Sequence, residues 1–148
     1  MVESVFSVDG VLARADPHYQ PREGQLAMAQ AVAHAMGAGE VLVAEAGTGV
    51  GKTYAYLVPA LLSGERVLLS TATKALQDQL FSRDIPRLVQ ALEVPVRVAL
   101  LKGRSSYLCL HRLGMARHAV GGESPQQIRV LAKIEEWSRS TRSGDLSE

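Results

Sequence analysis

Residues 45–53 have the types and the spacing of a phosphate-binding loop. They read Glu-Ala-Gly-Thr-Gly-Val-Gly-Lys-Thr, a Walker A pattern with alanine at the first position, where glycine is commoner. Glycines let the backbone point successive N–H groups at phosphate oxygens. Lys52 then supplies a positive charge to the β- and γ-phosphates, and the Thr53 hydroxyl completes the shell of a Mg²⁺ ion. The predicted ATP and Mg²⁺ site comprises Ala46, Gly47, Thr48, Gly49, Val50, Gly51, Lys52 and Thr53, with Lys52 and Thr53 as the catalytic residues.

A second group of residues precedes this loop. The amide of Gln25 can donate and accept hydrogen bonds at once, which matches the N6 and N7 positions of adenine. The ring of Tyr19 offers a face on which a base can stack. A single glutamine is more often part of a helix surface, but the place of Gln25, 20 residues before the loop, favours adenine binding.

A third group follows the loop. Thr73 stands after an apolar run at residues 66–70 and before Lys74 and Gln77. In an open parallel sheet, ligands bind beyond the carboxyl ends of the strands. A threonine there either caps the next helix or binds a phosphodiester backbone, and the two roles are compatible. Both interpretations of Thr73 therefore stay open.

The elements that must hold these groups are predicted by apolar patterns. Short apolar runs, typical of buried parallel strands, occupy residues 41–44, 66–70 and 96–101. Helical spacing predicts helices at residues 22–36, 54–62, 74–81 and 84–91. Strands joined by crossover helices form right-handed units. The sequence therefore predicts an α/β fold with a doubly wound, mostly parallel sheet and flanking helices.

The two ends of the chain are less regular. Residues 1–17 show weak periodicity, and a turn or helix boundary is expected at Asp16. Ser124 followed by Pro125 is a good helix start. The helix that they predict has apolar residues at helical spacing, namely Ile128, Leu131, Ile134 and Trp137.

Composition narrows the class of protein. The chain has 148 residues, 47% of them hydrophobic and 21% charged, with a net charge of +1. This suits one domain with a modest core, and any nucleic-acid site must be a local patch. We see no apolar run long enough to span a bilayer and no secretory signal, so no membrane partner is predicted. A single cysteine cannot form an internal disulfide, which favours a cytoplasmic location.

Taken in order, residues 19–25, 45–53 and 70–80 resemble the Q motif, motif I and motif Ia of superfamily 2 DNA helicases. The closest likeness is to the DinG/YoaA branch of the XPD-like group. The resemblance implies a partial RecA-like P-loop domain in which Tyr19, Arg22 and Gln25 bind the nucleotide. It implies that single-stranded or forked DNA is contacted by Thr73, Lys74 and Gln77, during ATP-driven 5′ to 3′ movement that serves DNA repair.

Residues 101–109 resemble the entry of this family into its iron–sulfur domain. A lone cysteine is usually a small buried hydrophobe. The resemblance instead implies that Cys109 is the first of four ligands of a [4Fe–4S] cluster. It also implies a division into the N-terminal part of a first RecA-like domain, residues 1–101, and the beginning of an iron–sulfur domain, residues 102–148.

Several parts of such an enzyme are missing from the sequence. A [4Fe–4S] cluster needs four thiolates, and this chain has one cysteine. No segment resembles the acidic Asp-Glu-Ala-His box or the second RecA-like domain. We therefore expect the N-terminal portion of an ATP-dependent 5′–3′ DNA helicase of the DinG/YoaA type. The alternatives are a truncated, catalytically inert nucleotide-binding module and an unrelated P-loop ATPase or kinase, and no protein partner is identified.

Overall fold

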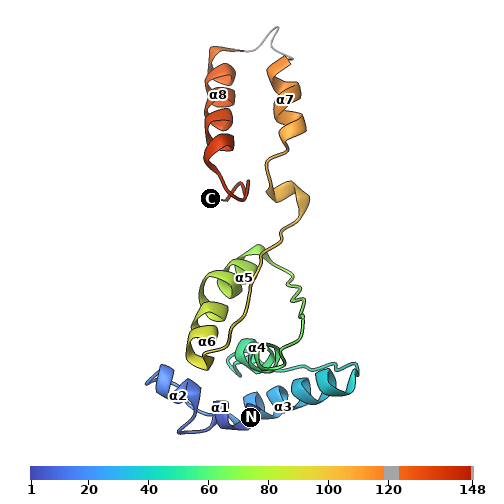
Figure 1. Cartoon of the computed structure of the whole chain (residues 1–148), viewed down its shortest axis with the longest axis vertical. Helices are drawn as coiled ribbons and strands as arrows, with labels where there is room; N and C mark the ends of the chain where they lie inside the picture. The colour runs from blue at the N-terminus through green and yellow to red at the C-terminus, as the bar shows by residue number, and fades with distance from the viewer. Residues whose placement is uncertain (119–123, 148) are drawn as a thin grey trace. The chain divides into compact units, whose positions relative to one another are not determined.

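The computed structural model describes residues 1–118 and 124–147 and divides into two compact units (Figure 1). The N-terminal unit is Met1–Ala99 and the C-terminal unit is Leu100–Glu148. Among the described residues, no helix is long and apolar enough to cross a membrane.

The N-terminal unit is built from helices. In chain order they are α1 (Val2–Phe6), α2 (Val11–Ala15), α3 (Glu23–Ala38), α4 (Lys52–Leu62), α5 (Lys74–Gln79), the π-helix η1 (Leu80–Asp84) and α6 (Ile85–Leu92). Helices α3 and α4 pack against each other, and α1 contacts both. The core that these helices share comprises Val5, Phe6, Leu12, Ala29, Ala55, Leu57, Val58, Leu80, Ile85 and Leu88.

Two of these helices flank the phosphate-binding loop, and both were predicted from the sequence. Helix α3 confirms the helix predicted at residues 22–36, and it ends at Gly39, whose φ of +68° forms a left-handed cap. Its N–H donates to the Ala35 carbonyl, which satisfies a carbonyl of the last turn. Helix α4, which runs from Lys52 to Leu62, confirms the helix predicted over residues 54–62.

The predicted α/β fold, with its RecA-like parallel sheet, is wrong for this structure. Residues 41–44, 66–70 and 96–101 are non-helical, and no strand is assigned anywhere in residues 1–118 or 124–147. Three apolar side chains of these segments are each 93% exposed, those of Val41, Val43 and Leu68. An apolar run favours an extended, buried chain, but a sheet forms only when a second segment pairs with its backbone N–H and C=O groups. These runs lack that pairing here, so the fold is helical.

The helical pattern between residues 74 and 92 also differs in detail. The sequence predicts helices at residues 74–81 and 84–91 with a break near Pro86. In the structure α5 passes directly into η1 and then into α6, and Pro86 lies in the first turn of α6. Proline is tolerated there because its missing N–H would have no partner in the helix. Helices α1 and α2 were not predicted, since five-residue helices show too little periodicity to be recognised.

The C-terminal unit contains the 3₁₀ turn η2 (Arg104–Ser106) and helices α7 (Leu110–His118) and α8 (Pro125–Ser140). The helix predicted after Ser124 is confirmed. Ser124 Oγ accepts a hydrogen bond from the Gln127 N–H, and Gln127 Oε1 accepts one from the Ser124 N–H, which forms a capping box. Helix α7 was not predicted. Residues 119–123 and 148 of the predicted iron–sulfur segment lie outside the described residues.

Candidate nucleotide-binding site

The phosphate-binding loop turns directly into the N-terminus of α4. Residues 48–50 form the turn, and Gly49 and Gly51 have φ angles of +82° and +89°. Only glycine adopts such angles at little cost. Because α4 begins at Lys52, its unpaired N–H groups and the positive end of its dipole lie at the loop. The loop therefore has the backbone that an anion site requires.

Lys52 is held over the same loop. Its Nζ donates hydrogen bonds to the carbonyls of Ala46 at 2.6 Å and Gly47 at 2.7 Å. An ammonium group has three N–H donors, so two of them fix the side chain and one remains for an anion. The structure thus places the Lys52 ammonium group at the loop, and its contact with the phosphates stays a prediction.

Gln25 is packed against the loop from α3. It is only 3% exposed, and its Nε2 donates to the Gly51 carbonyl at 2.9 Å. The Tyr19 hydroxyl lies 3.2 Å from Gln25 Oε1 and 3.3 Å from the Phe6 carbonyl. Burial raises the pKa of Tyr19 above its ordinary 10.0, and the charge of Arg22 opposes that rise. Both ends of the Gln25 amide are therefore engaged inside the protein.

Gly51 allows this close approach. A Cβ atom at Gly51 would overlap Gln25 Nε2, so the position requires glycine for space as well as for its φ angle. Arg22 makes a parallel contact, because its Nη1 donates to the Gly49 carbonyl at 2.6 Å. The sequence indicated all of these residues but not their contacts with one another.

A buried carboxylate between α5 and α6 was missed by the sequence analysis. Asp84 is 4% exposed, and it accepts hydrogen bonds from Gln79 Nε2 at 2.7 Å and Arg83 Nε at 2.9 Å. Burial raises the pKa of Tyr56 on α4, a hydrogen bond with Thr53 opposes this rise, and the charge of Asp84 adds to it. One available signal was the Asp-Ile-Pro sequence at residues 84–86, which places an acid at the start of a predicted helix.

Thr73 caps α5. Its Oγ1 accepts a hydrogen bond from the Leu76 N–H at 3.2 Å, which confirms the capping interpretation. Thr71 Oγ1 donates to the Thr73 carbonyl at 3.2 Å. Thr73 and Lys74 are exposed, and Gln77 is half-buried. These residues share the first turn of one helix.

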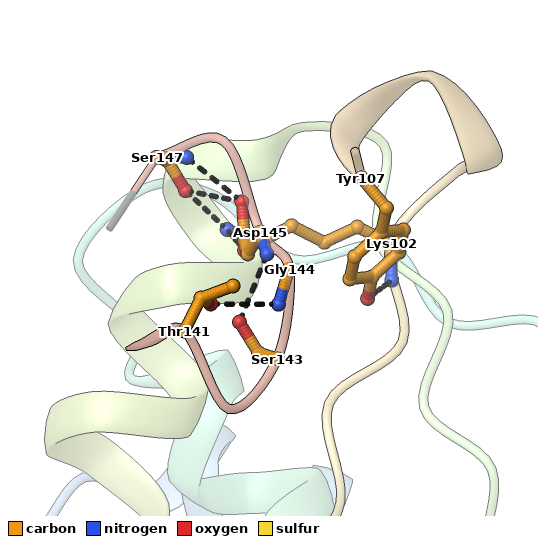
Figure 2. Close-up of polar contacts among 7 residues, drawn as sticks. All are labelled: Lys102, Tyr107, Thr141, Ser143, Gly144, Asp145 and Ser147. Atoms are coloured by element: carbon orange, nitrogen blue, oxygen red, sulfur yellow. Dashed lines mark hydrogen bonds and ion pairs between the residues drawn. The ribbon is translucent and has the colours of Figure 1, made fainter. Parts of the chain in front are cut away.

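Cys109 lies in the C-terminal unit. In the same unit, Lys102 and Asp145 form a polar contact (Figure 2). Lys102 Nζ lies 2.7 Å from Asp145 Oδ2, and the two side chains are 5% and 10% exposed. Backbone bonds of 2.8 Å and 2.9 Å join the N–H of Leu108 to the Gly144 carbonyl and the N–H of Leu146 to the Ser106 carbonyl. The segment just before Cys109 is thus hydrogen-bonded to the segment that follows α8.

The cysteine does not by itself fit an iron–sulfur cluster. Cys109 is exposed, so it is not the small buried hydrophobe that a lone cysteine usually is. Within the described ranges, no three His, Cys, Asp or Glu residues are grouped to hold a metal ion. A [4Fe–4S] cluster needs four thiolates, and this chain supplies one.

Both a family model and individual relatives of this chain are helicases. A family model described as DEAD/DEAH box helicase matches residues 26–135. The chain is 53% identical to the ATP-dependent DNA helicase YoaA of Escherichia coli (strain K12) over 143 residues. The matched region covers 96% of this chain and 22% of that protein. It is 45% identical over 149 residues to the YoaA protein of Haemophilus influenzae, covering 99% of this chain and 23% of that protein.

A third relative carries the other family name. The ATP-dependent helicase DinG of Mycobacterium tuberculosis (strain ATCC 25177 / H37Ra) is 44% identical over 145 residues, covering 84% of this chain and 22% of that protein. The chain thus spans between a fifth and a quarter of the length of these curated relatives.

Proposed function

The chain belongs to the DEAD/DEAH box helicase family, and from this membership we propose that it is the N-terminal portion of an ATP-dependent 5′–3′ DNA helicase of the DinG/YoaA type. The observation that carries the proposal is the joining of two predicted motifs. Arg22 and Gln25 donate hydrogen bonds to carbonyls of the phosphate-binding loop, at Gly49 and Gly51. These contacts are expected if the upstream motif and the loop belong to one nucleotide site.

The proposed ATP site uses this chain's own groups. The loop N–H groups from Gly47 to Gly51 bind phosphate oxygens, and Lys52 stabilises the negative charge on the γ-phosphate. The Thr53 hydroxyl, in the first turn of α4, is the hard oxygen donor that Mg²⁺ prefers. Bound Mg²⁺ would supply further neutralisation of phosphate charge.

Gln25 and Tyr19 are proposed to bind the base. An amide has two N–H donors and two acceptor lone pairs on its oxygen. The Gly51 carbonyl takes one donor, and the Tyr19 hydroxyl occupies one acceptor site. One donor and one acceptor remain, which is the pair that adenine N7 and N6 require.

The proposed DNA contacts lie on α5. Thr73, Lys74 and Gln77 would bind the phosphate backbone of single-stranded or forked DNA, and the exposure of Thr73 and Lys74 is consistent with this. We also propose that Cys109 is one ligand of a [4Fe–4S] cluster in a longer protein that supplies the other three. A cytoplasmic location and a role in DNA repair complete the proposal.

The proposal is tested by ATPase measurements on the full-length protein that contains this chain. We expect ATP hydrolysis that single-stranded DNA stimulates, and we expect Lys52→Ala to abolish it because the γ-phosphate loses its cation. Lys133→Ala removes a lysine of α8 outside the proposed site and should leave the rate unchanged. ATPase activity that survives Lys52→Ala at the wild-type rate would refute the assignment.

A second candidate concerns the 148 residues taken alone. They would form a nucleotide-binding module without turnover, because no segment of the sequence resembles the acidic box that positions the attacking water. Phosphate release by this chain itself would contradict the second candidate.

A further inference from the structure

The Tyr19 ring lies against the core of the N-terminal unit. It is half-buried and packs against the core cluster, of which Phe6 and Ala29 are members. A ring that stacks on a base must present a free face, and packing against the core leaves less of this ring free. The contacts of the Tyr19 hydroxyl therefore indicate its role better than the ring does.

The Tyr19 hydroxyl lies between two acceptor oxygens. One is Gln25 Oε1 at 3.2 Å, and the other is the Phe6 carbonyl at 3.3 Å. Phe6 is the last residue of α1 and is only 2% exposed, and α1 packs against both α3 and α4. A phenolic hydroxyl has one proton to donate, so the two oxygens share it. The hydroxyl is thus held at a fixed place beside the Gln25 amide.

Two contacts fix the orientation of the Gln25 amide. Its Nε2 donates to the Gly51 carbonyl at 2.9 Å, and its Oε1 accepts from the Tyr19 hydroxyl. A reversed amide would place its oxygen against the Gly51 carbonyl, where neither group has a proton to donate. With the Gly51 contact alone, the amide could still turn about that single bond. The Tyr19 hydroxyl removes this freedom and so directs the remaining N–H and lone pair of the amide.

We propose that Tyr19 is a positioning residue whose hydroxyl sets the preference for adenine, because it fixes the direction in which Gln25 presents its free donor and acceptor. The inference rests on the proposed function, since it takes Gln25 to bind adenine. Guanine has the acceptor O6 where adenine has the N6 donor. A Gln25 oxygen held in one direction therefore accepts from adenine and meets a second acceptor in guanine. An amide that turns freely would lose part of this distinction.

The nucleotide selectivity of the full-length protein tests the inference. Tyr19→Phe removes the hydroxyl and keeps the ring, so a role in stacking alone predicts unchanged binding. Loss of one hydrogen bond typically changes an equilibrium constant roughly 2- to 12-fold. We expect the ratio of the GTP dissociation constant to the ATP dissociation constant to fall at least about threefold. Because Tyr19 acts through Gln25, adding Tyr19→Phe to Gln25→Ala should leave the ratio of Gln25→Ala unchanged.

The control is Tyr54→Phe, which removes a hydroxyl from another tyrosine that packs against the same core. It should keep the wild-type ratio. The inference is overturned if Tyr19→Phe changes the ratio less than about threefold, which includes equal weakening of ATP and GTP, because a purely structural hydroxyl affects both nucleotides alike. It is equally overturned if the double variant has a lower ratio than Gln25→Ala. A wild-type protein that binds ATP no more tightly than GTP instead refutes the proposed binding of adenine by Gln25, and the inference with it.

Discussion

Gln25 is the residue whose two interpretations differ most in their consequences. In the structure its amide binds the loop at Gly51 and meets the Tyr19 hydroxyl. A residue that only fixes the loop would act on every nucleoside triphosphate alike. A residue that also binds adenine would distinguish ATP from GTP, because guanine has the acceptor O6 where adenine has the N6 donor, while N7 is an acceptor in both bases.

We predict that Gln25→Ala weakens ATP binding more than GTP binding. A lost bidentate base contact is worth about 1–3 kcal/mol, roughly 5- to 150-fold. The measurement is the pair of dissociation constants of fluorescent ATP and GTP analogues on the full-length protein. Gln30→Ala, at an exposed glutamine of the same helix, serves as the control and should change neither constant. Equal weakening of both nucleotides would show that Gln25 fixes the loop without reading the base.

At the scale of elements, Thr73 combines a cap with a proposed DNA contact. Aspartate caps helices as well as threonine does, but its charge repels phosphate. We therefore predict that Thr73→Asp keeps the thermal stability of the protein and weakens binding of single-stranded DNA. Thr73→Ala should lower stability by about 1 kcal/mol through loss of the cap. Calorimetry and fluorescence anisotropy measure the two properties. Unchanged DNA affinity in Thr73→Asp would remove Thr73 from the DNA interface.

The elements also show which part of the fold was accessible from the sequence. Helices α3, α4 and α8 were predicted because their hydrogen bonds, caps and apolar spacing lie within a few consecutive residues. The three strands were predicted wrongly because pairing depends on distant segments, which an apolar run does not specify. The site residues divide in the same way, into those recognised from a local motif and those that depend on distant contacts. The loop was recognised as a local motif, whereas the buried Asp84 depends on Gln79, Arg83 and the packing of α4.

The contact that closes the C-terminal unit gives a prediction about pH. Hydrogen bonds, first from Lys102 and then from Ser147, lower the pKa of Asp145 from its ordinary 3.8 to about 2. A carboxyl with a depressed pKa in the folded state stabilises the fold fully above its unfolded pKa, and the stabilisation is lost as the pH falls through the folded value. The loss should therefore occur between pH 3.8 and about pH 2.

Nuclear magnetic resonance of this chain checks that prediction. The Ser147 N–H donates to Asp145 Oδ1, so its chemical shift should follow the carboxyl titration with a midpoint near pH 2. Asp145→Asn removes the titrating group and should leave the shift flat in this range. A midpoint near 3.8 in the wild type would mean that the Lys102–Asp145 contact is not formed in solution.

At the scale of the whole molecule, the proposed nucleotide site stands in a sequence in which no segment resembles the acidic box that would activate water. Hydrolysis requires a residue that orients the attacking water. The carboxylate of Asp84 is only 4% exposed and accepts hydrogen bonds from Gln79 and Arg83, so it is poorly placed to bind an attacking water. Charge stabilisation by Lys52 alone then supports binding but not turnover.

We therefore predict that the 148-residue chain binds ATP and releases phosphate no faster than its own Lys52→Ala variant. The two proteins should differ in affinity, by about tenfold or more, because the variant lacks the charge-assisted bonds from Nζ to the phosphates. Titration with a fluorescent ATP analogue measures the affinity, and a coupled phosphate assay measures the rate. The variant thus controls for contaminating ATPases. Phosphate release by the wild-type chain above that background would mean that these residues already contain a water-activating group, and the carboxylates near the loop would then have to be tested one by one.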